Sequence, residues 1–125
     1  MRGDSMTKER QELGQAGENI AADYLTEAGL NIVERNYRCF RGEIDIVAMD
    51  GEELVFVEVR TRHAQSRVGT AEESVTHLKR ERLRALAASY VREKNYAQWP
   101  QMRFDVVAIT LDADDVQINW IRGAF

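Results

Sequence analysis

The amino-acid sequence predicts an α/β fold in which two helices pack on a mixed β-sheet, in the order α-β-β-β-α-β-β. Apolar residues recur with helical spacing in two segments, one near residues 10–28 and one ending near residue 94. Between them, an Asp-Gly pair separates two strand-like runs, which is a strong signal for a hairpin. Strands on both sides of the second helical segment imply a right-handed crossover between parallel strands.

The first half of the chain is expected to form a helix and three strands. The helix covers residues 10–28, and Gly29 ends it as a C-terminal glycine. Residues 30–35 follow as a short strand, and the basic and aromatic residues 36–42 as a turn or strand edge. Residues 43–48 and 53–60 form the hairpin, with Asp50 and Gly51 as its two loop residues.

The second half of the chain is expected to complete the sheet. Residues 62–68 have the composition of a polar loop, and the second helix begins at Thr70 or at Thr76, since either can cap it. Residues 104–111 are almost continuously apolar, which favours a central strand. Residues 116–121 alternate in polarity and form an edge strand, where a second copy of the chain could pair to give a homodimer.

Length and composition indicate one domain of a globular protein. The 125 residues suit a single core, expected over residues 13–125, with residues 1–12 as a flexible N-terminus. A single cysteine excludes an intrachain disulfide, and no apolar run approaches the roughly 20 residues of a membrane span. The first residues also lack the apolar stretch of a signal peptide. We therefore expect a cytoplasmic protein without membrane association.

The charge distribution is uneven although the net charge is only −4. This balance argues against a protein that coats nucleic acid by bulk charge. Local basic groups nevertheless lie beside the hairpin: Arg35, Arg38, Arg41, Arg60, Arg62, Arg67, Lys79, Arg80, Arg82 and Arg84. Each could be a solvated surface charge, but their grouping suggests contacts to a phosphate backbone.

Acidic side chains lie inside the predicted hairpin strands. Counted from the Asp-Gly loop, Glu43 lies opposite Glu58, and Asp45 lies opposite Phe56. Directly opposed residues share a face of the sheet, so Glu43, Asp45, Glu58 and Arg60 are expected to project from one side. This expectation depends on the loop assignment, because a shift of one residue would turn one strand over.

Gathered carboxylates need a compensating positive charge. Arg60 could supply it, which would make the group a salt-bridge ladder on a structural or interaction protein. A divalent cation is the alternative, because Mg²⁺ prefers carboxylate oxygens, backbone carbonyls and water. Such a site would suit hydrolysis of a phosphodiester bond, in which the cation activates water and offsets developing charge.

The arrangement of Asp45, then Glu58-Val59-Arg60 on the next strand, resembles the Asp…(Asp/Glu)-x-Lys signature of restriction-endonuclease-like nucleases. More closely, the chain resembles the YraN-like family of small bacterial proteins with that fold. The matching stretches are GQAGENIAADYL, ERNYRCFRGEIDIVAMDG, LVFVEVRTR, ESVTHLKRERL and RFDVVAI, which extend from Gly14 to Ile109. The same fold occurs in archaeal Holliday-junction resolvases, which similarly carry an acid on the first helix.

The resemblance implies an endonuclease that depends on Mg²⁺ or Mn²⁺ and acts on nucleic acid, on DNA in preference to RNA, with some selectivity for structure. Asp45, Glu58 and Arg60 would be catalytic, and the metal would be held by Glu18, Asp45, Glu58 and the Val59 carbonyl. Glu43 would support the ligands without binding the metal itself. The residues expected to contact nucleic acid are Arg35, Arg38, Arg62, Lys79 and Arg82.

One position departs from the signature, because Arg60 stands where the nucleases have lysine. Arginine stays protonated under ordinary conditions and cannot act as a general base, but it can bind phosphate with two hydrogen bonds. The metal and nucleic-acid sites therefore survive this change better than catalysis does. A nucleic-acid-binding module without cleavage remains an alternative to the enzyme, as does the structural salt-bridge protein.

Overall fold

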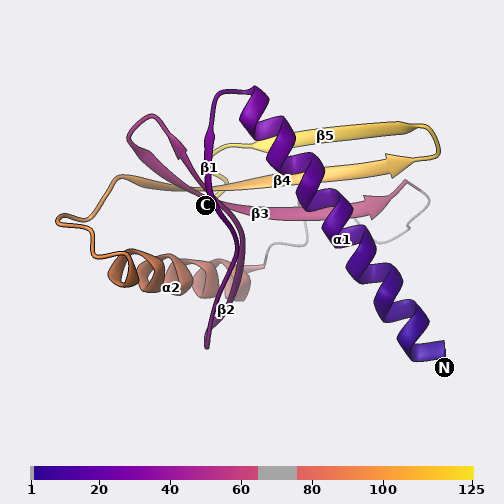
Figure 1. Ribbon diagram of the computed structural model, residues 1–125, viewed down its shortest axis with the longest axis horizontal. Coiled ribbons are helices and arrows are strands. Elements are labelled where there is room, and N and C mark those ends of the chain that lie inside the picture. Colours follow the sequence, from indigo (N-terminus) through magenta and orange to yellow (C-terminus); the bar gives the residue numbers. More distant parts are fainter. Residues whose placement is uncertain (1, 65–75) are drawn as a thin grey trace.

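The structure of this chain, a computed structural model, describes residues 2–64 and 76–125. Two helices and five strands follow one another in the predicted order, which confirms the α/β fold with a mixed sheet (Figure 1). The elements are α1 (Arg2–Glu27), β1 (Asn31–Cys39), β2 (Gly42–Asp50), β3 (Glu53–His63), α2 (His77–Glu93), β4 (Met102–Asp112) and β5 (Asp115–Ile121).

Several boundaries differ from those predicted. Helix α1 begins at Arg2 rather than near residue 10, whereas the predicted flexibility of residues 1–12 stays a prediction. Strand β1 continues through the basic and aromatic stretch to Cys39 and leaves only Phe40 and Arg41 as the turn. Thr76 caps α2 and accepts a hydrogen bond from the Lys79 amide at 3.3 Å. The alternative cap at residue 70, and the predicted loop from residue 65 onward, lie outside the described residues.

The strands lie side by side in the order β1-β2-β3-β4-β5. Strands β3 and β4 are parallel, as the crossover through α2 requires, and the other neighbouring pairs are antiparallel. Strand β5 is an edge strand, as predicted, and β3 is central. Along the described residues no helix combines the length and apolar character that a membrane crossing demands.

The register of the β2–β3 hairpin differs from the prediction by two residues. Met49 pairs with Leu54, whereas a loop at Asp50 and Gly51 would have paired it with Glu52. The loop consists of Gly51 and Glu52 instead, and Gly51 takes the first loop position with a φ of 63°. Glycine adopts this left-handed conformation without the steric cost of a Cβ atom, which explains why the loop begins there.

Each helix covers one face of the sheet with its own buried cluster. The cluster beneath α1 contains Ala21, Ala22, Leu25, Leu30, Ile46, Ala48, Val55, Val57, Val107 and Ile109. The cluster beneath α2 contains Tyr37, Ile44, Val47, Leu54, Phe56, Leu83, Leu86, Ala87, Tyr90 and Val91. Consecutive residues of β3 alternate between the two clusters, as side chains of a strand must. Strands β2 and β3 are thus packed on both of their faces.

Helix α1 packs through small residues and lies unusually close to β3. Gly17 is buried, and a Cβ atom in its place would overlap the Thr61 hydroxyl. The apolar spacing in the sequence predicts burial of Ala16 and Tyr24, but both are exposed, and Gly17, Ala21 and Leu25 are buried instead. The close approach rotates the helix so that its glycine and alanine face meets the sheet. Glu18, the next residue, is thereby brought down to the strands.

Strands β1 and β2 both change sides at a pair of facing positions, Asn36 and Asp45. Residues two apart in a regular strand share a face, yet Ile44 packs beneath α2 and Ile46 beneath α1. On β1, Arg35 hydrogen-bonds to Asn19 of α1, and Tyr37 is buried beneath α2. Asn36 between them has a φ of 55°. This kink turns the end of the β1–β2 hairpin away from the rest of the sheet (Figure 1).

Candidate functional site

The candidate site lies where β2 and β3 separate. Their pairing ends at Ile46 and Val57, and the next residue on β2 is Asp45. One carboxylate oxygen of Asp45, Oδ2, accepts a hydrogen bond from the Val59 backbone amide at 2.8 Å. In a continuing ladder a backbone carbonyl would bind such an amide. The Asp45 side chain therefore satisfies the opened edge of β3, and the kink in β2 holds it there.

Three carboxylates converge at this opening. Glu18 from α1, and Glu43 and Asp45 from β2, each place an oxygen so that the three atoms lie within 4.8 Å of one another. All three side chains are partly buried. We call Glu18, Glu43 and Asp45 the acidic cluster. It has the hard oxygen donors that Mg²⁺ and Mn²⁺ prefer, in a hollow with room left for water.

The Asn36 amide lies between two members of the acidic cluster. In the orientation that satisfies its hydrogen bonds, its nitrogen donates to Glu43 Oε1 at 2.6 Å and to Glu18 Oε1 at 2.7 Å. Sequence reasoning did not single out Asn36. The one available signal was an asparagine inside a predicted turn or strand edge, because asparagine tolerates positive φ better than other non-glycine residues.

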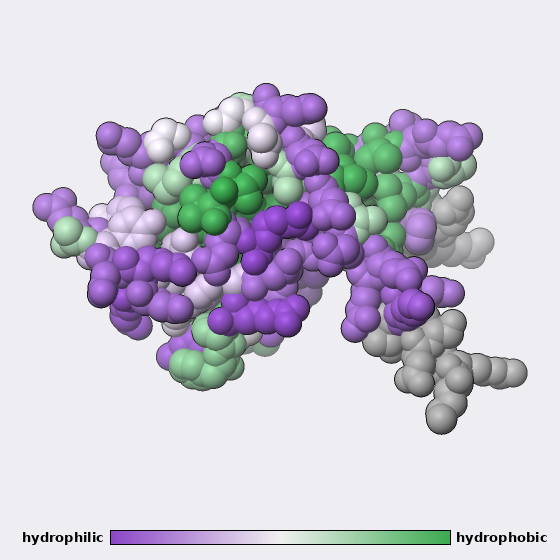
Figure 2. Space-filling view, in the orientation of Figure 1, coloured by the Kyte–Doolittle hydropathy of each residue, from purple (hydrophilic) through white to green (hydrophobic). Residues whose placement is uncertain are grey.

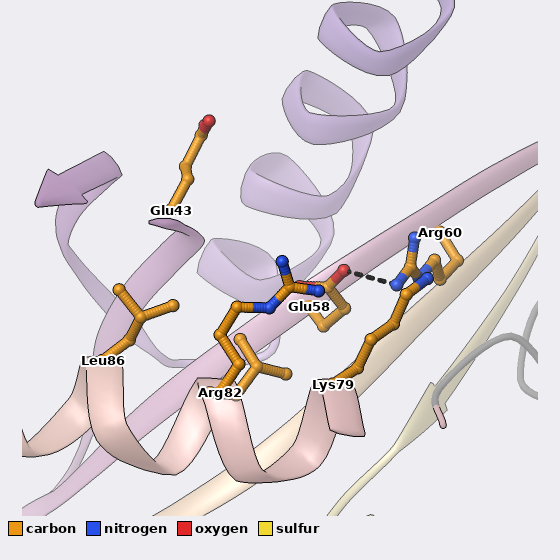
Figure 3. A pocket seen from close by; sticks show the side chains of 7 residues that line it. Glu43, Glu58, Arg60, Lys79, Arg82 and Leu86 are labelled. Carbon is orange, nitrogen blue, oxygen red and sulfur yellow. Dashed lines mark ion pairs between the residues drawn. The ribbon is translucent and has the colours of Figure 1, made fainter. Parts of the chain in front are cut away.

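Glu58 and Arg60 approach the opening from the other face, beneath α2. They form an ion pair at 2.9 Å and line a cavity together with Lys79 and Arg82 of α2 (Figure 3). We call Arg60, Lys79 and Arg82 the basic wall. Arg60 also lines the hollow on the α1 side, next to Asp45 and Val59. The site therefore extends across the opening from one face of the sheet to the other.

The prediction that the acidic residues and Arg60 project from one face is met in part, because Glu43, Glu58 and Arg60 line one cavity, whereas Asp45 lines the hollow on the α1 side. The two-residue change in register would have preserved the faces, because side chains alternate with a period of two. The kink at Asp45 does not: it brings Glu43 to Glu18 of α1, while Glu43 still lines the cavity beneath α2 with Glu58. The structure thus brings the predicted residues together across an opening in the sheet instead of on one of its faces.

Burial and mutual repulsion make the acids hold protons more tightly than usual. Burial raises the pKa of Asp45, against the Val59 amide, and the charge of Glu43 raises it further. Burial, then the charge of Asp45, raises the pKa of Glu58 to about 7 despite Arg60. The pKa of Glu18 is raised by burial and by its two neighbours in the cluster. The nearby arginines therefore do not fully offset burial and repulsion at these carboxylates, and a divalent cation would add the missing positive charge.

The other predicted basic residues are more exposed or lie at the margin. Burial, then the charge of Arg60, lowers the pKa of Lys79 in the basic wall. The exposed Arg38 pairs with Glu43 at 3.3 Å and lines the hollow that holds the acidic cluster. Arg35 binds Asn19 at 2.8 Å on the α1 side. Arg62 lies two residues beyond Arg60 on β3, so strand alternation places it on the same side.

Comparison with known proteins places this site within a family. The model of "Uncharacterised protein family UPF0102" matches residues 17–109, which include every member of the acidic cluster and the basic wall. The chain belongs to the UPF0102 family. The resemblance to YraN-like proteins is thereby confirmed.

Similarity to individual UPF0102 proteins extends over almost the whole chain. The UPF0102 protein of Moorella thermoacetica is 52% identical over 122 residues, which cover 96% of this chain and 100% of that protein. The one of Desulfitobacterium hafniense (strain DSM 10664 / DCB-2) is 47% identical over 121 residues, covering 94% and 99%. The one of Rhodococcus opacus is 47% identical over 114 residues, covering 90% and 95%. These relatives are therefore similar in length and organisation.

Proposed function

We propose that this protein is a divalent-cation-dependent endonuclease that hydrolyses phosphodiester bonds of DNA. The observation that carries the proposal is the meeting of two opposite charge groups at one opening in the sheet. Glu43 of the acidic cluster lines the cavity of the basic wall, and Arg60 of the basic wall lines the hollow that contains Glu18 and Asp45. A phosphate bound by the basic wall would lie beside the carboxylates, which is the arrangement that metal-assisted phosphodiester hydrolysis requires.

The residues present fit a Mg²⁺ or Mn²⁺ ion. Glu18, Asp45 and Glu43 offer oxygens from the α1 side, and the Val59 carbonyl and Glu58 are the further donors expected from the resemblance. A bound ion would lower the pKa of a water molecule and polarise the phosphate. Hard cations of this kind are held by carboxylates and usually keep several water molecules. Water molecules can therefore complete the coordination of the ion where the protein offers too few oxygens.

Arg60 and Glu58 would divide the remaining work. Arg60 is permanently charged, so it cannot take a proton from water, but its guanidinium can bind a phosphate and offset the negative charge of the transition state. Glu58 would serve as a further carboxylate donor, because a bound cation favours the ionised form of an acid whose pKa is otherwise raised by burial. Arrival of the phosphate at Arg60 would compete with the ion pair and release Glu58 for this role.

A cleavage assay tests the proposal directly. Labelled junction, flap and single-stranded DNA are incubated with the protein and with Mg²⁺ or Mn²⁺. We expect cleavage by the natural protein and a loss of at least about 100-fold in Asp45→Asn, since one charged ligand contributes several kcal/mol. Asp114→Asn, an exposed aspartate between β4 and β5, is the matched control and keeps full activity. Absence of cleavage with either metal, or equal cleavage by Asp45→Asn, contradicts the proposal.

A second candidate is a DNA-binding module that does not cleave. The observation that favours it is Arg60, where the resembling nucleases have lysine, in an ion pair with Glu58. This candidate predicts salt-dependent DNA binding without turnover. Arg60→Lys separates the two candidates, because it restores the nuclease signature at the same position. If the arginine alone prevents hydrolysis, Arg60→Lys gains cleavage that the natural protein lacks.

A further inference from the structure

The turn between β1 and β2 presents an isolated aromatic side chain to solvent. Phe40 is 90% exposed, more than any other large apolar side chain within residues 8–64 and 76–125 whose burial is known. It forms a two-residue loop with Arg41, between the paired residues Cys39 and Gly42. Figure 2 shows an apolar protrusion at the lower edge of the molecule, over the end of this hairpin and among hydrophilic neighbours. No hydrophobic cluster of the described residues includes Phe40.

This turn is adjacent to the candidate site. Glu43 of the acidic cluster lies three residues beyond Phe40, and an extended chain rises about 3.3 Å per residue, so the two positions are at most roughly 10 Å apart. Gly42 rests against α2, since a Cβ atom there would contact Leu86 at 3.6 Å and Arg82 at 3.7 Å. Figure 3 shows Glu43 above Leu86 and Arg82. The turn therefore continues the basic wall.

Arginines lie in the turn and at its base, beside the exposed ring. The Arg41 guanidinium carbon lies 4.9 Å from the centre of the Phe40 ring, on its face. Arg38, at the base of the turn, has a side chain that is 74% exposed. An aromatic ring combined with guanidinium groups is the composition of surfaces that bind single-stranded nucleic acid, where bases stack on the ring and phosphates meet the arginines. A purely hydrophobic partner would instead bring these charges into an apolar contact at a desolvation cost.

We propose that Phe40 stacks against an unpaired base of the DNA strand that the site cleaves, and that the substrate is therefore unpaired beside the scissile phosphate. This inference rests on the proposed function, because it uses the same strand path across the acidic cluster. Bases inside a duplex have both faces covered by their neighbours, so away from the ends of a duplex only an unpaired base can offer a face to Phe40.

Binding measurements in EDTA, where cleavage does not interfere, test this inference. Fluorescence anisotropy compares a labelled single strand of DNA with a blunt duplex of the same sequence at low salt. The natural protein is expected to bind the single strand several-fold more tightly. Phe40→Ala should weaken this binding roughly 5- to 150-fold, the range of one base–aromatic stack, and change duplex binding by less than about 2-fold. Phe40→Trp should keep single-strand binding. Trp99→Ala, a 60% exposed aromatic in the connection between α2 and β4, is the matched control and should bind normally.

Salt dependence distinguishes stacking from charge. Phe40→Ala should leave the slope of the logarithm of the binding constant against the logarithm of the salt concentration unchanged. Arg41→Gln should reduce the size of this slope by about 1, which corresponds to one phosphate contact fewer. Equal single-strand binding by the natural protein and Phe40→Ala overturns the inference but not the proposed function. Absence of DNA binding by the natural protein overturns both. If Phe40→Ala instead converts a dimer to a monomer in sedimentation velocity, without an effect on single-strand binding, the turn is an interface between subunits and the inference is wrong.

Discussion

Asp45 has a structural role and a proposed chemical role at the same position. Its carboxylate accepts the Val59 amide where the β2–β3 ladder ends, and it is also a member of the acidic cluster. Removal of the side chain would leave a backbone donor without its partner, which costs about 1–3 kcal/mol when the donor is buried. Asparagine at this position keeps an oxygen acceptor and removes only the charge. Asp45→Asn is therefore a better probe of the chemistry than Asp45→Ala.

Glu58→Gln is expected to reverse a pH-dependent loss of stability. The pKa of Glu58 is raised from 4.5 to about 7 in the folded protein, so folding favours the neutral carboxyl. The stability that the neutral form contributes is fully present below about pH 4.5 and is lost as the pH rises through 7, where the buried carboxyl must ionise. The variant should have nearly the natural stability at pH 4.5. At pH 8 its free energy of unfolding should exceed that of the natural protein by roughly 1–3 kcal/mol.

Urea denaturation at pH 4.5 and pH 8, in EDTA, measures this difference. Glu52→Gln, at an exposed position of the β2–β3 loop, is the control and should not change the pH dependence. Saturating Mg²⁺ should narrow the gap at pH 8, because a cation that binds only the folded state stabilises the charged acids. A difference between the variant and the natural protein that is the same at both pH values speaks against the stated cause.

At the scale of the elements, the site depends on how closely α1 approaches β3. Gly17 meets Thr61 with no space for a methyl group, whereas Gly14, one turn earlier, has nothing within 4 Å of the place of its Cβ atom. Alanine stabilises a helix interior by about 1 kcal/mol relative to glycine, so helix propensity alone predicts the same gain at both positions. The contact between Gly17 and Thr61 makes the expected effects of alanine at the two positions opposite in sign. Glu18 follows Gly17 directly, so displacement of the helix also displaces a member of the acidic cluster.

Gly17→Ala is therefore expected to destabilise the protein by about 1–3 kcal/mol, the usual cost of overpacking. Gly14→Ala should stabilise it by about 0.5–1 kcal/mol. Thermal unfolding measures both changes, and a Mg²⁺ titration followed by the melting temperature should show weaker binding for Gly17→Ala only. Stabilisation by both substitutions would show that the close approach does not exist in solution.

At the scale of the whole molecule, Arg103 and Asp105 join the far end of the sheet. Arg103 pairs with Asp50 at 2.8 Å and with Glu53 at 2.9 Å, both beside the β2–β3 loop. It also pairs with Asp105, which is completely buried, at 3.1 Å. Asp105 accepts further hydrogen bonds from the Trp120 indole at 2.9 Å and from a backbone amide after β5 at 3.0 Å. This network ties β2, β3, β4 and β5 together, which gives Arg103 and Asp105 a structural role.

Asp105→Ala is expected to cost about 3–5 kcal/mol, because it breaks the buried ion pair with Arg103 and leaves the Trp120 indole without its acceptor. Arg103→Met combined with Asp105→Leu removes both charges and should recover part of that loss. Urea denaturation of the single and double variants measures this coupling. Equal stability of the two would show that the cost of Asp105→Ala comes from lost packing and not from the unpaired charge.

Much of the architecture was accessible to sequence reasoning because its signals are local. Helical periodicity, the Asp-Gly pair and the strand–helix–strand order were sufficient for the element order, the parallel pair β3–β4 and the edge position of β5. The register and the buried face of α1 were wrong, since the first depends on which loop residue takes positive φ and the second on a glycine contact. Neither leaves a periodic signal in the residues around it.

The candidate site shows the same division. The sequence by itself determined which acids lie near the hairpin, that Arg60 accompanies them, and that a basic helix follows. Only the tertiary structure decided that Glu43 joins Glu18 and Asp45, because the kink at Asn36 and Asp45 turns two paired strands over together. Such a kink is stabilised by packing on both faces of the sheet and by an opening between strands. Those are contacts between residues far apart in the chain, so no local pattern could reveal them.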